Sequence, residues 1–494
     1  MSNFAPRRVK SLVLGSVAAC SLVACATTSQ QAQAQGANAA ITPAEAQQGA
    51  QSHQQFLDEF GGAMSGSQAA YVEQVGRNIA VQSGLANSQS AFTVTLLNSS
   101  IDNAFAVPGG YVYITRNLVS LMNNEAELAG VLGHEVGHVA ARHSAKRQKA
   151  ATRNSILGAI GSILSGVLLG NSQLGQLGQQ LASAAPQLAT LKYSRGQETE
   201  ADNLGIQYLT TAGYDPHAMA TVLASLAAQT NLDAQLQGRD STIPQWASTH
   251  PDPASRVRAA NSRAGNRTGV TNRDTFLSRI DGLVYGDDPH QGVIEGNTFI
   301  QPDLRLTFSV PSGFYMMNGT RAVSINGQAG QAQFTTAAYN GNLETYTQQA
   351  FQALAGQSQI PAPTLRRTTI NGIPAVYGIT RANSGNSQVD VVVVAYQFSN
   401  NQAYHFAAIT AAGRSNVFDG MFNSVRRITS AEAAQVVPRR IDVVTAARND
   451  TVQSLAGRMA YPSAQVERFR VLNALSSNSQ VVPGQRYKIV VRSS

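Results

Sequence analysis

The chain has 494 residues, of which 43% are hydrophobic and 13% are charged, so it is long enough for two to four folded domains. The formal net charge is +8 at pH 7, but no Lys/Arg stripe or recognition motif accompanies it, which argues against nucleic-acid binding. The two cysteines, Cys20 and Cys25, lie near the N-terminus, so a cysteine nucleophile and a cysteine zinc site are excluded from the folded domains.

The first 24 residues have the features of a bacterial export signal. Arg7, Arg8 and Lys10 form a basic region, and the apolar run 11–19 is too short to span a bilayer. Residues 22–25, Leu-Val-Ala-Cys, resemble a lipobox, in which the cysteine receives a diacylglyceryl group. We therefore expect residues 1–24 to be a lipoprotein signal peptide and Cys25 to be lipidated, which would anchor the protein stably in a membrane. An ordinary signal peptide, cut close to this cysteine, is the alternative.

The segment after the expected lipid anchor is polar. Residues 25–53 are rich in Gln, Ala, Ser and Thr and show no apolar periodicity, which predicts a flexible tether. Cys20 is a second, poorer candidate for lipidation. Ala26 follows Cys25 in place of the aspartate that retains lipoproteins at the inner membrane, so the predicted location is the outer membrane.

Residues 54–265 are expected to form a mainly helical domain with a small sheet. Residues 92–96 alternate as a strand does, and two further runs, 104–107 and 111–115, flank Pro-Gly-Gly as in a hairpin. A mostly apolar run at 156–169 is too short to cross a bilayer and is read as a buried helix, with a lid or membrane-facing element as the alternative.

Two further units are expected after this domain. Residues 286–428 contain short β-rich runs separated by turn signals and one helical stretch at about 343–355, which predicts an α+β domain of unknown role. Residues 442–491 form a small last unit.

One helix carries a metal-binding pattern. A capping pattern at residues 124–127 starts it, and His134 and His138 then lie four residues apart on one face, where their nitrogens can converge on one ion. Glu135 projects beside that ion and can act as a general base without being a ligand. His143 is turned off this face and is read as structural. The pattern predicts catalysis with one Zn²⁺ per chain.

A catalytic zinc site needs a third protein ligand, and the sequence offers no third histidine at the metzincin spacing. A second helix, starting after a capping pattern at residues 194–197, carries Glu198 and Asp202 on its apolar side, whereas Glu200 points away. Metal ligation by Glu198, with Asp202 orienting a ligand histidine, would explain this pair. A solvated acidic helix start is the alternative, and it fits Glu200 better.

Four segments together resemble a known family: residues 103–110, 134–138, 194–202 and 249–256. The chain is similar here to the gluzincin peptidases that include the CAAX prenyl endopeptidase, and specifically to the bacterial periplasmic branch with the β-barrel assembly-enhancing protease. The resemblance covers about residues 65–260. It implies Glu198 as the third ligand and the hairpin near Gly109 as an edge strand that pairs with an extended substrate.

The chain departs from parts of that family. It has no run of transmembrane helices, so integral-membrane prenyl-protease activity is not implied. It also has no tetratricopeptide array, which puts in doubt any partner docking that such repeats provide.

Residues 442–491 look like a LysM module, a small βααβ glycan binder. The resemblance rests on segments 450–456, 472–473, 483–485 and 487–491. Such a module would hold the protein at peptidoglycan. A degenerate module that only packs against the rest is the alternative.

His250 and Arg256 are candidate active-site residues far along the chain from the metal helix. Pro251 restricts the backbone before it, so the loop can fix the direction of the His250 imidazole. Either residue could donate a hydrogen bond to the oxyanion of the tetrahedral intermediate. Alternatively, His250 could take the fourth zinc position and keep the enzyme latent.

The predicted fold is thus multidomain: a mainly α gluzincin-type zinc peptidase domain with a small β-sheet, an α+β domain, and a small βααβ LysM-like unit. The predicted function is zinc-dependent hydrolysis of misfolded or unassembled envelope polypeptides. An assembly factor or chaperone, and a peptidoglycan-binding lipoprotein with little proteolysis, are the alternatives.

Overall fold

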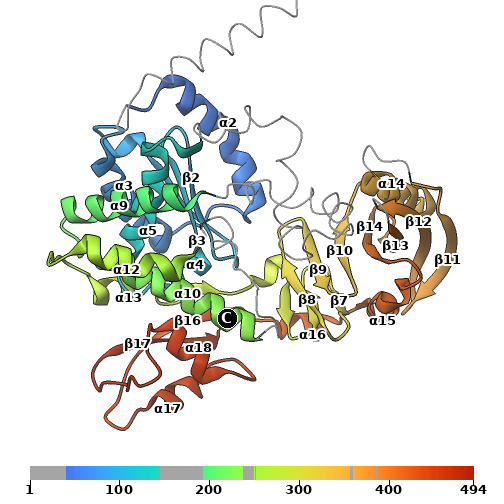
Figure 1. Ribbon diagram of the computed structural model, residues 1–494. Helices are drawn as coiled ribbons and strands as arrows, with labels where there is room; N and C mark the ends of the chain where they lie inside the picture. The colour runs from blue at the N-terminus through green and yellow to red at the C-terminus, as the bar shows by residue number, and fades with distance from the viewer. Residues whose placement is uncertain are drawn as a thin grey trace, which may run out of the picture.

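The computed structural model describes residues 40–144, 193–236, 250, 252–355, 360–384 and 387–493. Three lobes are visible: a mainly helical lobe, a β-rich lobe beside it, and a small unit beneath the helical lobe (Figure 1). The helical lobe consists of the described residues between 40 and 285 and contains the predicted peptidase domain, so we call it the peptidase part. The predicted signal peptide, Cys25 and the apolar run 156–169 lie outside the described residues. Among the residues described, none of the helices combines the length and apolar character needed to span a membrane.

The peptidase part contains a three-stranded sheet whose order is β1-β3-β2. Its strands are β1 (Thr93–Leu97), β2 (Ala104–Val107) and β3 (Tyr111–Thr115), which confirms the three predicted strands. β1 runs parallel to β3, and β2 pairs with β3 as the antiparallel hairpin that the Pro-Gly-Gly turn predicted. β2 is therefore an edge strand of this sheet.

Helices surround this sheet. In chain order they are α2 (Pro43–Glu59), α3 (Ser67–Ala80), α4 (Arg116–Leu121), α5 (Glu125–Ala140), α9 (Arg195–Thr211), α10 (Ala218–Leu236), α12 (Pro253–Ala264) and α13 (Arg273–Ile280). Short 3₁₀ turns lie at Val81–Ser83 and Gln89–Ala91. α5 packs against α3, α9 and α10, so it is enclosed on several sides.

Helix α2 corrects one prediction. The expected tether reached residue 53, but the helix begins at Pro43, where Thr42 and Glu45 form a complete capping box. Phe56 then packs edge-on against Phe105 and Tyr113, with ring centroids 5.4 Å apart in both pairs. The tether prediction is therefore wrong for residues 43–53, because local capping and contacts of His53 and Phe56 with the hairpin dock this polar helix.

The β-rich lobe contains two sheets and confirms the predicted β-rich character. The four-stranded sheet, in the order β15-β7-β6-β5, contains β5 (Val293–Glu295), β6 (Thr298–Gln301), β7 (Leu306–Ser309) and β15 (Arg426–Arg427). The seven-stranded sheet, in the order β11-β12-β13-β14-β10-β9-β8, contains β8 (Phe314–Asn318), β9 (Ala322–Gly327), β10 (Gly330–Thr336), β11 (Thr364–Ile370), β12 (Ile373–Ser384), β13 (Ser387–Ser399) and β14 (Gln402–Ala411).

Helices complete this lobe. They are α14 (Leu343–Ala355), at the predicted position, α15 (Asp419–Ser424) and α16 (Ser430–Ala434), with 3₁₀ turns at Pro289–Gln291 and Ser415–Phe418. Phe308, Phe334 and Phe406 meet in its core with ring centroids 4.8 to 4.9 Å apart. This core is separate from the core of the peptidase part.

Residues 439–493, which we call the C-terminal unit, have the predicted βααβ order. The elements are β16 (Arg439–Thr445), α17 (Val452–Ala456), α18 (Gln465–Leu472) and β17 (Arg486–Arg492). A short strand from the end of the peptidase part, β4 (Val284–Tyr285), extends the sheet to the order β17-β16-β4. The element order agrees with a LysM-like unit, but neither a LysM module nor glycan binding is shown.

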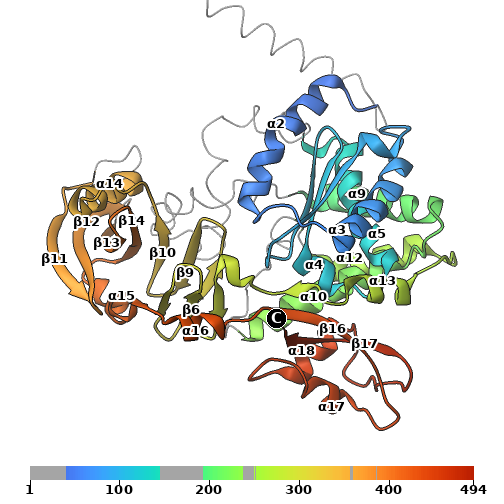
Figure 2. The same cartoon turned by 180° about the vertical axis from the view of Figure 1, so that it is seen from behind.

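The C-terminal unit shares its core with the peptidase part. Buried side chains such as Phe469, Leu472 and Ile489 belong to the same hydrophobic cluster as the buried faces of α3, α5 and α10. Both views place the unit against the peptidase helices, directly below α10 (Figures 1 and 2). The C-terminal unit is therefore packed against the peptidase part, and the two share one hydrophobic core.

Candidate metal centre

The predicted metal helix is α5, and it begins as the sequence indicates. The Asn124 side chain accepts a hydrogen bond of 2.9 Å from the Glu127 amide. The Glu127 carboxylate does not complete a capping box. It accepts instead from the Asn123 amide at 2.7 Å and from the Thr221 hydroxyl at 2.6 Å. α5 is buried over most of its length, because helices pack on several sides of it.

A second buried carboxylate fixes the start of α5. Glu125 accepts hydrogen bonds from the hydroxyls of Tyr71, at 2.6 Å, and Tyr214, at 2.8 Å, and from the Asn272 amide at 2.8 Å. These three donors come from three different segments of the chain. The first turn of the metal helix is thus held from several directions.

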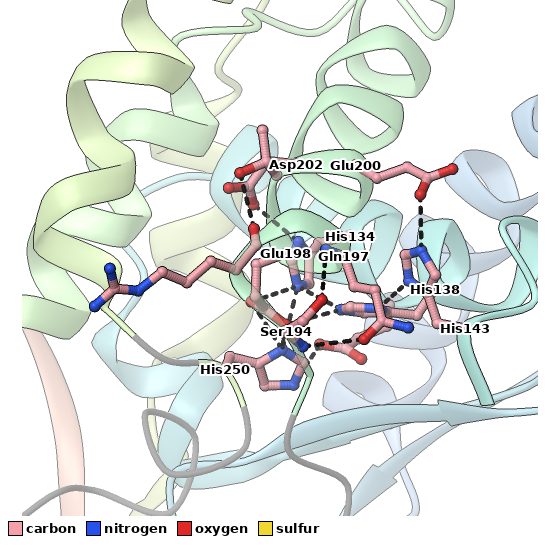
Figure 3. A network of polar contacts seen from close by, with 12 residues as sticks. His134, His138, His143, Ser194, Gln197, Glu198, Glu200, Asp202 and His250 are labelled. Atoms are coloured by element: carbon pink, nitrogen blue, oxygen red, sulfur yellow. Dashed lines mark hydrogen bonds and ion pairs between the residues drawn. The ribbon is translucent and has the colours of Figure 1, made fainter. Parts of the chain in front are cut away.

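Four side chains could hold a metal ion: His134, His138, Glu198 and His250. One donor atom from each lies within 4.8 Å of all the others, and all four residues are buried. His134 and His138 come from α5, Glu198 from α9, and His250 from the segment before α12 (Figure 3). The structure therefore brings together the three predicted ligands and the candidate His250.

The distances show convergence on one point. Nε2 of His138 is 3.0 Å from Nε2 of His134, and Nδ1 of His250 is 3.3 Å from the same atom. Oε1 of Glu198 is 3.1 Å from Nδ1 of His250 and 3.4 Å from Nε2 of His138. Three imidazole nitrogens and one carboxylate oxygen form a donor set that suits Zn²⁺. The residues present thus fit a zinc ion.

Asp202 and Arg256 orient these groups from behind. Oδ1 of Asp202 lies 2.9 Å from Nδ1 of His134, the ring nitrogen that faces away from the cluster. Arg256 donates through Nε to Asp202 at 2.7 Å and through Nη1 to Glu198. Asp202 therefore lies between His134 and Arg256, behind the donor cluster. This arrangement favours an orienting role for Arg256 over the oxyanion role, because its guanidinium is engaged by both carboxylates.

These contacts keep the two carboxylates charged. Burial alone would raise the pKa of Glu198, but His250 and His138 outweigh it and hold this pKa below its ordinary value. Burial would likewise raise the pKa of Asp202, and the hydrogen bonds from Arg256 and His134 lower it. Both groups are therefore acceptors at neutral pH, as ligation and support of a ligand require.

The sequence did not indicate the full role of His143. Its Nδ1 lies 2.7 Å from Nδ1 of His138, and its Nε2 lies 3.1 Å from Glu200 (Figure 3). The residue is off the ligand face, as predicted, yet it contacts the outer nitrogen of a candidate ligand. Arg142, with φ of 54°, turns the chain back just beyond the helix, so helical phase could not predict this contact.

Glu135 lies beside the cluster without belonging to it. Its side chain is 1% exposed, and its Oε1 is 3.5 Å from Nε2 of His250. Burial raises the pKa of Glu135, while the nearby His250 and His134 act in the opposite direction. Glu135 thus lies beside the candidate ligands and outside their donor set.

Comparison with known proteins agrees with this geometry. Residues 66–264 match the sequence model described as Peptidase family M48. This part of the chain is therefore similar to the peptidases of family M48. The match runs from α3 to α12 and contains every candidate residue of the metal centre.

Three relatives show how far the similarity extends. The β-barrel assembly-enhancing protease of Yersinia pestis is 36% identical over 226 residues, which cover 44% of this chain and 44% of that protein. Its counterpart in Escherichia coli K12 is 33% identical over 201 residues, covering 39% of each chain. A mitochondrial metalloendopeptidase of Schizosaccharomyces pombe is 30% identical over 209 residues, covering 42% of this chain and 57% of that protein. The chain therefore matches less than half the length of these bacterial relatives.

We expect Glu198→Ala to lose the bound metal and Glu200→Ala to retain it. Glu198 points into the donor cluster, whereas Glu200 contacts His143 and does not belong to that cluster. Metal content of the two purified variants, measured by atomic emission against the wild type, checks this. Equal retention in both variants would remove Glu198 from the ligand set.

Proposed function

We propose that this protein is a zinc-dependent endopeptidase that hydrolyses misfolded or unassembled polypeptides of the bacterial cell envelope. The observation that carries the proposal is a buried cluster of three imidazoles and one carboxylate with a second buried carboxylate, Glu135, beside it. The M48 match over residues 66–264 supports it, since metalloendopeptidases are among the matching relatives.

In this proposal His134, His138 and Glu198 hold one zinc ion per chain. A bound zinc ion supplies Lewis acidity toward a carbonyl oxygen and lowers the pKa of water. Asp202 and Arg256 fix the directions of His134 and Glu198, and His143 does the same for His138. Each ligand is thus held by a partner that is not itself in the cluster.

Glu135 is the proposed general base and acid. It would accept a proton from the attacking water and pass it to the leaving amine. The burial of Glu135 raises its pKa above the ordinary glutamate value. A carboxyl group whose pKa is closer to the working pH can more readily both accept a proton and later donate it. A site that served only for structure would need no such carboxylate, which disfavours the alternative of a non-enzymatic assembly factor.

The edge of strand β2 is the proposed substrate-binding element. β2 pairs with β3 on one side, and no other strand pairs with it within the described segments of the chain. α5, which carries Glu135, packs against β2. An extended polypeptide could add to this edge through backbone hydrogen bonds. Such binding selects unfolded segments over folded domains, which supports the proposed class of substrate.

We further propose that Cys25 is lipidated and anchors the protein at the periplasmic face of the outer membrane. The lipobox-like residues 22–25 and Ala26 support this location, and the two bacterial relatives are named for β-barrel assembly. Cys25→Ala is expected to move the protein from the membrane pellet to the soluble fraction, because acyl chains provide the anchoring energy. Unchanged pelleting of the variant would contradict lipidation at this residue.

We expect Glu135→Gln to lose about 10²- to 10⁴-fold in the rate of casein hydrolysis, the usual contribution of a general acid–base group. The amide keeps the size of the side chain, and the four donors of the cluster are untouched. The variant should therefore retain wild-type metal content. Loss of metal together with activity would assign Glu135 a different role.

The variant His250→Ala separates the two roles left open for His250. Its Nδ1 lies among the candidate ligands and its Nε2 lies near Glu135. If His250 blocks the fourth metal position, its removal should raise the rate of casein hydrolysis and cause self-degradation. If it donates to the oxyanion, removal should slow hydrolysis by about 10²- to 10³-fold. A wild-type rate with unchanged zinc affinity would exclude both roles.

A further inference from the structure

The segment between β3 and the metal helix is short and buried. α4 follows β3 directly, with Thr115 as its N-cap, and Asn124 caps α5 three residues after α4 ends. We call residues 116–124 the connector. It joins the hairpin, whose edge is the proposed substrate-binding strand, to the helix that carries Glu135. The geometry between substrate and base therefore depends on how firmly the connector is held.

Lys488 of the C-terminal unit holds the end of the connector. The lysine lies on β17 and is 0% exposed. Its ammonium donates to the backbone carbonyls of Ser120, at 2.7 Å, and Met122. Carbonyls at the C-terminal end of a helix have no partner within that helix, so these two groups need an outside donor.

The backbone of Lys488 is itself fixed. The Asn473 side chain accepts from the Lys488 amide at 2.7 Å and donates to the Lys488 carbonyl at 2.8 Å. Asn473 follows α18 directly, and α18 packs against both α4 and α10. The two hydrogen bonds with Asn473 therefore fix the backbone from which the Lys488 side chain reaches the connector.

Glu127 provides the opposite charge. It lies in the first turn of α5, is 2% exposed, and interacts electrostatically with Lys488. Burial lowers the pKa of Lys488 to about 7, and Glu127 opposes that shift. A buried ammonium is costly unless charge and hydrogen-bond partners compensate it. Here the ammonium donates to the carbonyls of Ser120 and Met122 at the end of α4, and the Glu127 carboxylate of α5 adds a favourable charge interaction.

Arg116 holds the other end of the connector to the same sheet. It is 0% exposed and donates to the Asn98 side chain at 2.7 Å. It also donates to the carbonyls of Val284, at 3.1 Å, and Gly286, at 2.6 Å. Val284 belongs to β4, which pairs with β16. The sheet β17-β16-β4 therefore contacts both ends of the connector.

We infer that Lys488 is a positioning residue for the peptidase reaction, through which the C-terminal unit fixes the substrate-binding hairpin relative to the metal helix. This inference rests on the proposed function. A displacement of about 1 Å between reacting groups can cost about 100-fold in rate, so a loose connector would reduce turnover while leaving the metal ligands in place.

The test is Lys488→Met in the full chain, with the exposed Arg458→Met of the same unit as matched control. Methionine keeps the unbranched shape and removes the charge and the donors. We expect wild-type zinc content, a kcat for casein hydrolysis reduced about ten- to hundredfold, and little change in KM. Rates are measured well below the unfolding temperature of each variant and are normalised to folded protein, so lost stability alone would leave kcat unchanged.

A second readout does not depend on activity. Amide hydrogen exchange in residues 117–127 should be faster in Lys488→Met than in Arg458→Met, because the connector has lost its donor. Asn473→Ala, which loosens Lys488 without removing its charge, should lower kcat in the same direction and serves if Lys488→Met does not fold.

Unchanged kcat per folded molecule, or unchanged exchange in the connector, would overturn the inference. Failure of the proposed function is recognised separately, because the wild type would then show no casein hydrolysis above Glu135→Gln. The exchange measurement would still test whether Lys488 holds the connector.

Discussion

Burial of the metal-facing groups is the constraint on which the rest of the peptidase part depends. His134, His138, Glu198 and His250 are all removed from water, and ionisable groups in that position are costly unless other groups compensate them. Compensation comes from a layer of partners behind the cluster, chiefly Arg256 with its bonds to Glu198 and Asp202. Helices α3, α9 and α10 pack around α5, and this packing helps to hold the supporting residues in fixed positions.

The start of α5 repeats this pattern at some distance from the cluster. Glu125 and Glu127 are both buried, and each is satisfied by donors from elsewhere in the chain. Negative side chains in the first turn of a helix interact favourably with its dipole, but full burial needs more than that. Tyr214 and Thr221 supply hydroxyl donors, and Lys488 supplies positive charge from the C-terminal unit. Residues outside the M48 match thus contribute to the environment of the helix at its centre.

Much of the candidate site could be predicted from the sequence because it depends on local periodicity. Spacing of four residues places His134 and His138 together, and helical phase separates Glu198 from Glu200. The contact between His138 and His143 could not be predicted, since it depends on a left-handed residue, Arg142, after the helix ends. Long-range contacts carry no such local signal.

In the fold, too, elements with a local sequence signal could be predicted, whereas long-range contacts could not. The hairpin and the helix α14 were predicted from turn residues and periodicity, and both lie where expected. Docking of α2 was missed, because its polar composition indicated a tether whereas a few contacts with the hairpin hold it. Composition indicates how much apolar surface a segment can bury, but a few specific contacts, such as those of His53 and Phe56 with the hairpin, can still dock a polar helix.

Treating the C-terminal unit as an autonomous module is also incorrect in physical terms. A module that folds alone needs its own core, whereas Phe469 and Ile489 of this unit belong to the core of the peptidase part. Deleting the unit would expose that shared core and remove the donor to the connector, so a truncated chain would lose peptidase structure along with any glycan binding. A role for this unit at peptidoglycan can therefore be assessed only with substitutions on its exposed surface, where residues such as Arg448 and Arg458 can change without altering the core. Any ligand that altered the packing of β17 would also change the contact between Lys488 and the carbonyl of Ser120. Because Ser120 lies in the connector that leads into the metal helix, such a ligand would affect the position of that helix.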